Sequence, residues 1–256
     1  MRPAHRRASQ IRRRARLQPP FRQGLRSGGA RLSRCLGLLG GVGIGAAVHY
    51  YEALAAAHAA KGEPLPLVMV NADMPTGLRY VQAGDLQGLA RYLAGLIDRM
   101  RAAGAELAAI PAVTPHICFN ELSPITLLPL VDIVTPLADH LRTKGIRRAA
   151  LFGTRFTIES AMFGRLAGID LVKPRADEIT TIHDAYMRTA NSGKGAPDDH
   201  RALTAMARTL IERDGAEAII FAGTDLSLLF DTDNTTFPSI DCAQLHIEAI
   251  LRAQGL

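Results

Sequence analysis

Two titratable side chains lie a few residues after short apolar runs of this 256-residue chain. His116 follows the run at 107–111, and Asp225 follows the run at 218–222. If these runs are parallel strands, both side chains lie at the sheet edge where α/β proteins bind ligands. An imidazole and a carboxylate placed there can accept and deliver protons. The sequence therefore predicts acid–base roles for His116 and Asp225, and a structural histidine is the alternative for His116.

Threonine hydroxyls accompany these groups. They stand beside the two titratable residues and again after the apolar run at 149–152. Hydroxyl and backbone N–H groups donate hydrogen bonds to carboxylates. We therefore predict substrate contacts at Val113, Thr114, Thr154, Thr157, Gly223 and Thr224, with Thr114 also a candidate acid–base group. Simple capping of a helix is the alternative for the two threonines of the 149–157 segment.

The segment 41–46 reads Gly-Val-Gly-Ile-Gly-Ala and lies between an apolar run and a helical pattern. A dinucleotide-binding turn would place an acid about 20 residues further on, at the end of a second strand. Glu63 and Asp73 do not fit that place well. We therefore predict that Gly41 and Gly43 offer N–H groups to a smaller anion such as a carboxylate. A tight turn without a ligand is the alternative.

Other chemistries find little support. The three cysteines form no C-x-x-C pair, and the eight histidines form no H-x-x-x-H pair, so no metal site is predicted. No phosphate-binding Walker loop and no G-x-S-x-G turn is present. The lysines stand at helix ends or in loops, which disfavours pyridoxal phosphate. We predict no cofactor, and the low cysteine content favours a reducing compartment.

Apolar runs alternate with helical patterns along residues 35–256, which predicts an α/β fold with parallel sheets. The predicted strands are 35–39, 65–71, 107–111, 130–133, 149–152, 170–172, 218–222 and 237–240. The predicted helices include 49–60, 85–103, 137–144, 179–191 and 200–214.

An internal repeat divides this α/β pattern into two. Gly-Ala-Glu occurs at 104–106 and again at 215–217, and each copy precedes an apolar run. The segments 38–41 and 151–154 recur at nearly the same separation. We predict two pseudo-symmetric lobes, 35–135 and 136–256, each a parallel sheet flanked by helices, with a ligand cleft between them.

The positive net charge of +6 comes from one end of the chain. Residues 1–34 hold eleven Arg and no acid, whereas residues 35–256 have a net charge of −5. We expect segment 1–34 to be a disordered extension, with an organelle transit peptide, an anion-binding arm and a secretory signal as alternatives. We expect no nucleic-acid binding by residues 35–256. No apolar run is long enough to cross a membrane.

Taken together in order and spacing, these motifs make residues 33–256 resemble the aspartate/glutamate racemase family. The matching segments are 37–41 with 50–51, 104–106 through Thr114-x-His116, 151–157, 215–217 through 223–226, and Asp241 with His246. The resemblance implies two α/β lobes that bind a small amino or hydroxy acid between them without a cofactor. It also implies two cysteines, one per lobe, that exchange protons on opposite faces of the α-carbon.

This chain departs from the family pattern at both thiols. Ala112 and Gly223 stand where the family has cysteine, and Val113 stands where it has the asparagine that helps to hold the substrate. The side chains of alanine and glycine have no titratable group, so the two-thiol mechanism is excluded at these positions. Cys118 and Cys242 are other thiols near the motifs, although buried structural cysteines are more common.

The functional expectation is a racemase or isomerase, independent of pyridoxal phosphate, of a small acidic amino acid or related carboxylate, using non-cysteine acid–base groups. The alternatives are an enzyme that works on one face, such as a lyase or decarboxylase, and a non-catalytic carboxylate-binding protein. We expect a cytoplasmic location, or an organelle if segment 1–34 targets one. A homodimer is left open.

Overall fold

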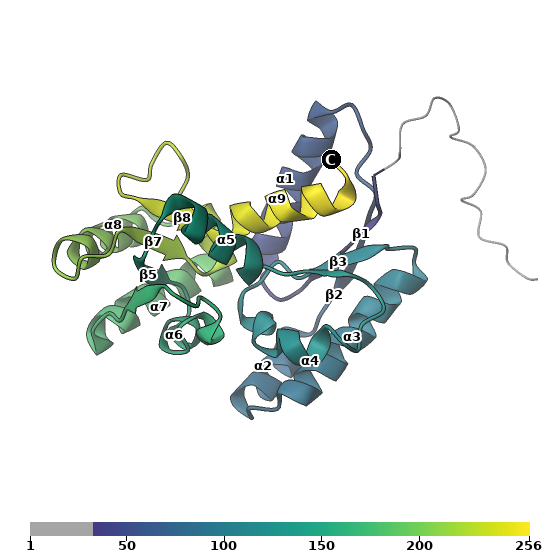
Figure 1. Ribbon diagram of the computed structural model, residues 1–256, viewed down its shortest axis with the longest axis horizontal. Coiled ribbons are helices and arrows are strands. Elements are labelled where there is room, and N and C mark those ends of the chain that lie inside the picture. The colour runs from purple at the N-terminus through teal and green to yellow at the C-terminus, as the bar shows by residue number, and fades with distance from the viewer. Residues whose placement is uncertain (1–32) are drawn as a thin grey trace, which may run out of the picture. The chain divides into compact units, whose positions relative to one another are not determined.

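Eight short parallel strands form two four-stranded sheets in residues 33–256, the part of the chain that the computed structural model describes (Figure 1). The first sheet has the order β2-β1-β3-β4 and the second the order β6-β5-β7-β8. The strands are β1 (Leu36–Gly40), β2 (Leu67–Asn71), β3 (Leu107–Ala109), β4 (Leu130–Val131), β5 (Arg148–Phe152), β6 (Asp170–Val172), β7 (Ala218–Phe221) and β8 (Ser239–Asp241). The expectations for segment 1–34 lie almost entirely outside the described residues.

Helices connect and cover these strands. They are α1 (Ile44–Ala60), α2 (Met74–Gln82), α3 (Leu86–Ala102), α4 (Phe119–Leu122), α5 (Val134–Lys144), α6 (Arg155–Glu159), α7 (Ala176–Ser192), α8 (Pro197–Glu212) and α9 (Cys242–Gln254). All eight predicted strands are present, and the predicted α/β fold with two parallel sheets is confirmed. The two sheets share one strand order, as the internal repeat predicts.

The first sheet is covered on both faces because its strands are apolar on both sides. In β1, Leu36 and Leu38 pack against α1 and α9, whereas Leu39 packs in the cluster formed by α3. Figure 1 shows α1 and α9 on one side of this sheet and α3 on the other. The segments that follow the carboxyl ends of β1, β2 and β3 can position a site.

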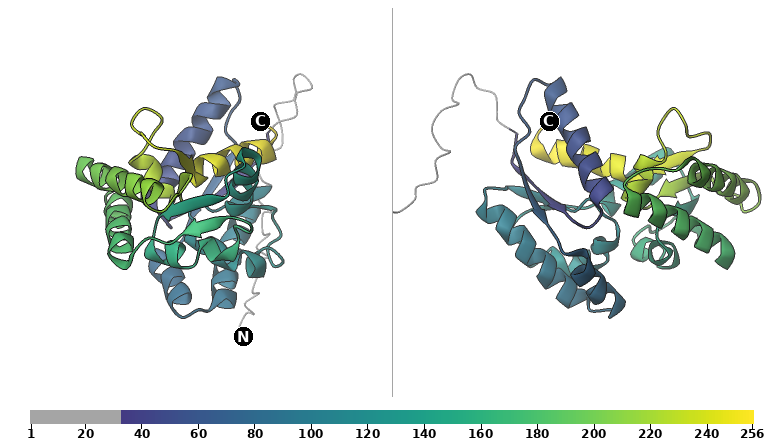
Figure 2. Two further views of the ribbon diagram at one scale, coloured as in Figure 1. Left: turned by 60° about the vertical axis from the view of Figure 1, so that its left-hand side comes forward. Right: turned by 180° about the vertical axis from the view of Figure 1, so that it is seen from behind.

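Helix α9 follows the last strand of the second sheet and packs against the first sheet. Ile247 and Ile250 lie in one apolar cluster with Leu36 and Leu38. The views of Figures 1 and 2 show α9 beside α1. A hydrogen bond of 3.0 Å between the Tyr50 hydroxyl and Nδ1 of His246 joins these two helices. The C-terminal helix therefore links the two sheets.

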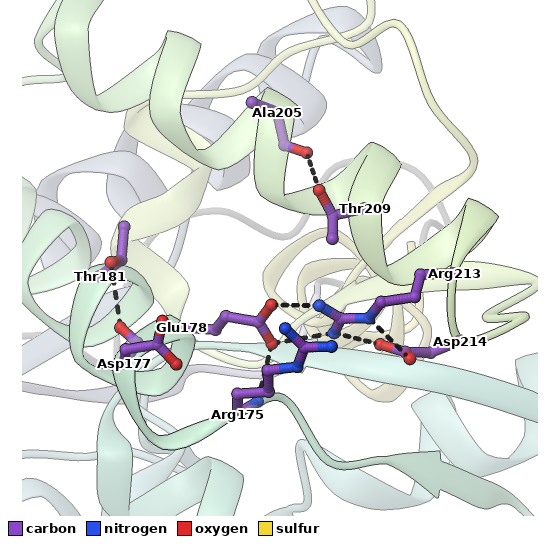
Figure 3. Close-up of polar contacts among 8 residues, drawn as sticks. All are labelled: Arg175, Asp177, Glu178, Thr181, Ala205, Thr209, Arg213 and Asp214. Carbon is purple, nitrogen blue, oxygen red and sulfur yellow. Dashed lines mark hydrogen bonds and ion pairs between the residues drawn. The ribbon is translucent and has the colours of Figure 1, made fainter.

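An ion-pair network ties α7 to α8 in the second lobe (Figure 3). The Arg213 guanidinium contacts Glu178 at the start of α7 and its own neighbour Asp214. Glu178 also accepts the backbone N–H of Arg175 at 2.7 Å. Hydrogen bonds from Arg213 hold the pKa of Glu178 below its usual value. This network is structural, since it lies away from the strand ends described next.

None of the helices in residues 33–256 has the length and apolar character that crossing a membrane requires.

Candidate active site

The carboxyl ends of strands from both sheets enclose a cavity of about 150 Å³. Seven of the ten residues predicted to take part in a site line it: Gly43, Val113, Thr114, Thr154, Thr157, Gly223 and Asp225. Ala112, where the resemblance implies the first thiol, lines it as well. Most residues that the sequence analysis assigned to a site therefore lie together in the fold. The catalytic and binding roles assigned to them stay predictions.

Gly41, Thr224 and His116 do not line this cavity. Gly41 has a φ of 80° and sits so close to the backbone of Ala72 that no side chain fits. Thr224 is buried, and its hydroxyl donates to the carbonyl oxygen of Pro111 at 3.1 Å. Because Pro111 follows a strand of the first sheet, this hydrogen bond joins the two lobes. These two residues shape the site rather than face it.

His116 is a buried histidine beneath the strand end. Its Nδ1 lies 2.8 Å from the carbonyl oxygen of Ala112, and its ring stacks on Phe119. Burial lowers the pKa of His116, which keeps the ring neutral. Its other nitrogen, Nε2, has no hydrogen-bond partner among the described residues. The geometry matches the structural alternative and gives His116 no contact with the cavity.

Asp225 is the titratable group that the sequence prediction and the cavity share. It is 2% exposed, and its two carboxylate oxygens have different partners. Oδ1 accepts the N–H of Ala46 at 3.0 Å, and Oδ2 accepts the hydroxyl of Tyr186 at 3.1 Å. Burial raises the pKa of Asp225 above its usual value, and the two hydrogen bonds oppose that change. Asp225 is thus a desolvated, oriented carboxylate, the environment in which acid–base groups are tuned.

The last residue of the glycine-rich segment 41–46 donates its backbone N–H to this carboxylate. Ala46 lies in the first turn of α1, and a Cβ on Gly43 would come within 3.3 Å of Oδ2 of Asp225. A Cβ on Gly45 would come within 2.5 Å of the Leu228 side chain. The loop therefore lacks side chains because the Asp225 segment packs against it. The Asp225 carboxylate lies at this helix start, and the contacts of Gly41 and Gly43 with a substrate carboxylate stay predictions.

Tyr186 on α7 is a site residue that the sequence reasoning missed. Its ring fills the space beside Gly223, where a Cβ would overlap Cε2 and lie 2.9 Å from Cδ2. Burial and the neighbouring Asp225 carboxylate raise the pKa of Tyr186 well above its usual value, so the phenol keeps its proton. A tyrosine from α7 therefore occupies the place where the resemblance implies the second thiol. Nothing in the local sequence around Tyr186 signals this contact.

Thr154 and Thr157 serve the start of α6 as well as the cavity. The Thr154 hydroxyl accepts the N–H of Thr157 at 3.1 Å, so it caps the helix as the alternative held. The two hydroxyl oxygens lie 2.9 Å apart. One hydroxyl hydrogen is used between them, which leaves the other available to a ligand. Capping and ligand contact are compatible in this arrangement.

The remaining thiols are unsuited to proton transfer. Neither Cys118 nor Cys242 lines the cavity, and both are buried. Burial raises the pKa of Cys118 to about 12 and that of Cys242 well above its usual value. A thiolate is therefore disfavoured at both positions. Among residues 33–256, no group of three metal-ligating side chains is found.

Helix α2 and the start of α3 complete the cavity, and neither was assigned to the site from sequence. Met74, Leu78 and Val81 of α2 line it together with Leu89 and Leu93 of α3. Asp73 caps α2 through two hydrogen bonds with Thr76, one to the N–H at 3.0 Å and one to the hydroxyl at 2.5 Å. These hydrogen bonds lower the pKa of Asp73, which keeps it ionised at the cavity edge.

Solved structures with this fold include racemase-like proteins. A Yersinia pestis protein described as a candidate Asp/Glu racemase superimposes with a TM-score of 0.75 and 24% identity, covering 87% of this chain and all of that one. An aspartate racemase homologue from Pyrococcus horikoshii gives a TM-score of 0.73 and 21% identity, again covering 87% and 100%. These likenesses establish the shared fold.

Sequence comparison points the same way. The broad specificity amino-acid racemase RacX of Bacillus subtilis is 26% identical over 149 residues, which is 56% of this chain. The match spans 62% of that relative's length, which is less than two thirds. The family model described as Asp/Glu/Hydantoin racemase matches residues 39–250, nearly all of the described chain. The chain belongs to the Asp/Glu/Hydantoin racemase family.

Proposed function

We propose that the protein is a cofactor-independent enzyme of the racemase or isomerase type, acting on a small amino acid or related carboxylate. Its reaction moves a proton at the carbon next to the substrate carboxylate, in the cavity between the two sheets. The observation that carries the proposal is the hydrogen-bonded pair of Asp225 and Tyr186 at the place of the second thiol. Family membership supports the reaction type, and the pair supplies groups that can move protons.

Substrate binding comes first. The hydroxyls of Thr114 and of the Thr154–Thr157 pair line the cavity at the strand ends. They are neutral donors that can hold one carboxylate beside the reacting carbon. Hydrogen bonds to this carboxylate also stabilise the charge that develops there when the neighbouring C–H bond breaks.

The protonation states of Asp225 and Tyr186 determine how the proton is transferred. Asp225 accepts the α-proton, and the electron pair of the broken C–H bond moves into the substrate carboxylate to give an enediolate. The protonated Asp225 then exchanges its proton with solvent or returns it to the same carbon. Tyr186 stays protonated because its pKa is raised, so its hydroxyl stabilises the Asp225 anion between proton transfers.

This arrangement supports chemistry on one face of the substrate. Ala112, on the side of the first thiol, carries no proton. Asp73 is a weak base because its Thr76 hydrogen bonds lower its pKa. Asp225 therefore has no equally basic partner from the first sheet among the described lining residues. Exchange with retained configuration is expected to be faster than inversion.

The test is α-proton exchange in heavy water, followed by NMR with both enantiomers of a panel of amino and hydroxy acids. We expect loss of the α-proton signal, with inversion of configuration following more slowly. Asp225→Asn should abolish it, since the amide keeps an acceptor for Ala46 but cannot take the proton. Asp139→Asn, at an exposed position of α5 outside the cavity, should leave the rate unchanged.

A second function follows from the two missing thiols, which favour a carboxylate-binding protein without catalysis. Saturable binding of a panel member, without exchange of its α-proton in the wild-type protein, would establish that function and overturn the enzyme proposal. Exchange that persists in Asp225→Asn would instead overturn the role of Asp225.

A further inference from the structure

We propose that the cavity selects a substrate with an apolar side chain, in place of the acidic side chain that the family resemblance implied. The inference rests on the proposed function for the position of the reacting carbon. It concerns the part of the cavity built by α2 and α3 of the first lobe.

The first observation is an apolar stripe on α2 that the protein covers only in part. Met74, Gly77, Leu78 and Val81 line the cavity, and their spacing places them on one face of a helix. No residue of α2 is fully buried, and Met74 and Leu78 are 40% and 44% exposed. Large apolar side chains that stay this exposed are stabilised when a ligand covers them.

The α3 part of the lining is apolar too. Leu89 and Leu93 of α3 line the same cavity and are 2% and 1% exposed. Val42, from the glycine-rich loop, completes this wall. A substrate side chain in this part of the cavity therefore contacts aliphatic groups from α2, α3 and the glycine-rich loop. Such an apolar lining favours an aliphatic or aromatic substrate side chain over a charged, hydrated one.

The second observation is the absence of cations. The described residues that line the cavity include no Lys, Arg or His. The cation on α2, Arg79, donates to the Thr76 hydroxyl at 2.7 Å and does not line the cavity. A second substrate carboxylate would have to lose its water without gaining an ionic partner, which is strongly unfavourable.

The charges that do face the cavity are negative. Asp73 and Asp225 both line it, and hydrogen bonds from Thr76 keep Asp73 ionised at the α2 end. An acidic substrate side chain would therefore meet a like charge as well as an apolar wall. The threonine hydroxyls provide for the one carboxylate next to the reacting carbon.

The size of the cavity fits this assignment. A dry cavity of about 150 Å³ lined by aliphatic and aromatic side chains holds benzene in another protein. The cavity here is about 150 Å³, so a side chain the size of that of leucine or methionine fits while the polar groups face the strand ends.

The experiment measures binding and α-proton exchange separately on the full chain. Both enantiomers of Leu, Met, Phe, Asp, Glu and Lys are titrated by calorimetry and then incubated in heavy water. We expect Leu or Met to bind at least about tenfold more tightly than Asp and Glu, as burial of one aliphatic side chain predicts. Equal or tighter binding of Asp or Glu would overturn the inference, and a preference for Lys would overturn it in favour of Asp73 as the specificity group.

A gain-of-function variant tests the wall directly. Leu78→Arg places a cation on the cavity side of α2 at a partly exposed position, so the fold should persist. We expect it to lower the preference for Leu over Asp or Glu by about tenfold or more, since it removes an aliphatic contact and adds an ionic partner. Gln82→Arg adds the same charge to α2 at an exposed position outside the cavity and should leave the preference unchanged.

The readouts separate the two proposals. Tight binding of Leu without exchange would support the apolar selectivity and overturn the catalytic proposal. Exchange of Asp or Glu, with no binding of Leu, Met or Phe, would support catalysis and overturn the apolar selectivity. An unchanged preference in Leu78→Arg would show that α2 does not contact the substrate side chain, and would overturn the inference.

Discussion

The ring of Tyr186 occupies the space that a side chain at residue 223 would need. Glycine is therefore required at position 223 by its neighbour. The hydroxyl of Tyr186 ends on Asp225, two residues after Gly223, which fixes the ring in place. Tyr186 thus fills the place where the resemblance implies the second thiol.

Gly223→Ala should destabilise the protein by about 1–3 kcal/mol, the usual effect of an extra methyl group in a filled space. The ring cannot move aside without losing its hydrogen bond to Asp225. Chemical denaturation measures the change, and adding Tyr186→Ala should relieve the overlap. Gly95→Ala is the control, because a Cβ there meets nothing within 4 Å and the residue lies within α3. A Gly223→Ala variant as stable as the wild-type protein would show that the space is free.

Tyr186→Phe should slow α-proton exchange by about a hundredfold while it lowers stability by only about 1 kcal/mol. The ring that fills the space beside Gly223 remains, and only the hydroxyl on Asp225 is lost. NMR exchange rates and urea denaturation give the two quantities. Tyr80→Phe, which changes a tyrosine outside the cavity, should alter neither. Equal exchange rates in Tyr186→Phe and the wild-type protein would mean that the phenol only fills space.

Ala112→Cys should speed up inversion of configuration relative to α-proton exchange. Residue 112 lines the cavity, and the resemblance places it on the face opposite residue 223. A thiol there would supply the proton carrier that the first lobe lacks. Chiral chromatography of the products measures inversion, and Ala102→Cys, at the exposed end of α3, is the control. Products of unchanged configuration would show that the missing thiol is not what limits inversion.

The strands were predictable because each is a short apolar run between polar or glycine-rich segments, as 149–152 and 218–222 illustrate. Local sequence is enough where a strand is buried on both faces. Helix α2 was not predicted, since Pro75 and Gly77 weaken its helical pattern and its apolar residues face a cavity. The contribution of α2 to the cavity depends on its position relative to α3 and the second lobe. Local sequence patterns do not reveal that position.

Site residues, too, were predictable from local sequence only where they follow a strand. Asp225 and Thr154 were predictable because polar residues after strands meet at one edge of each sheet. His116 met the same criterion yet lies beneath the edge, where its Nδ1 is paired with Ala112. Tyr186 comes from the middle of α7, and its position depends on the absence of a side chain at Gly223. Such contacts between distant segments are set by packing.

The buried histidines at the junction of the two sheets should make stability fall as the pH is lowered. His246 is held neutral, with Nδ1 3.0 Å from the Tyr50 hydroxyl and Nε2 3.0 Å from the carbonyl oxygen of Val131. Burial, with His116 nearby, lowers the pKa of His246 to about 3 in the folded protein. In the unfolded chain the pKa of a histidine is about 6.5. The unfolded state therefore binds a proton below pH 6.5 that the folded state refuses until about pH 3.

The free energy of unfolding should accordingly be constant above about pH 7 and fall by up to roughly 4 kcal/mol between pH 6.5 and pH 3. His116 adds to this fall, because burial lowers its pKa too. Asp132 contributes only at lower pH: burial opposes its ionisation, but Arg165 and Thr135 hold its pKa at about 2. Urea denaturation at pH 7, 6, 5 and 4 measures the slope. His246→Gln should flatten it, and His140→Gln on α5 should not; equal slopes in all three proteins would show that His246 does not titrate as its burial requires.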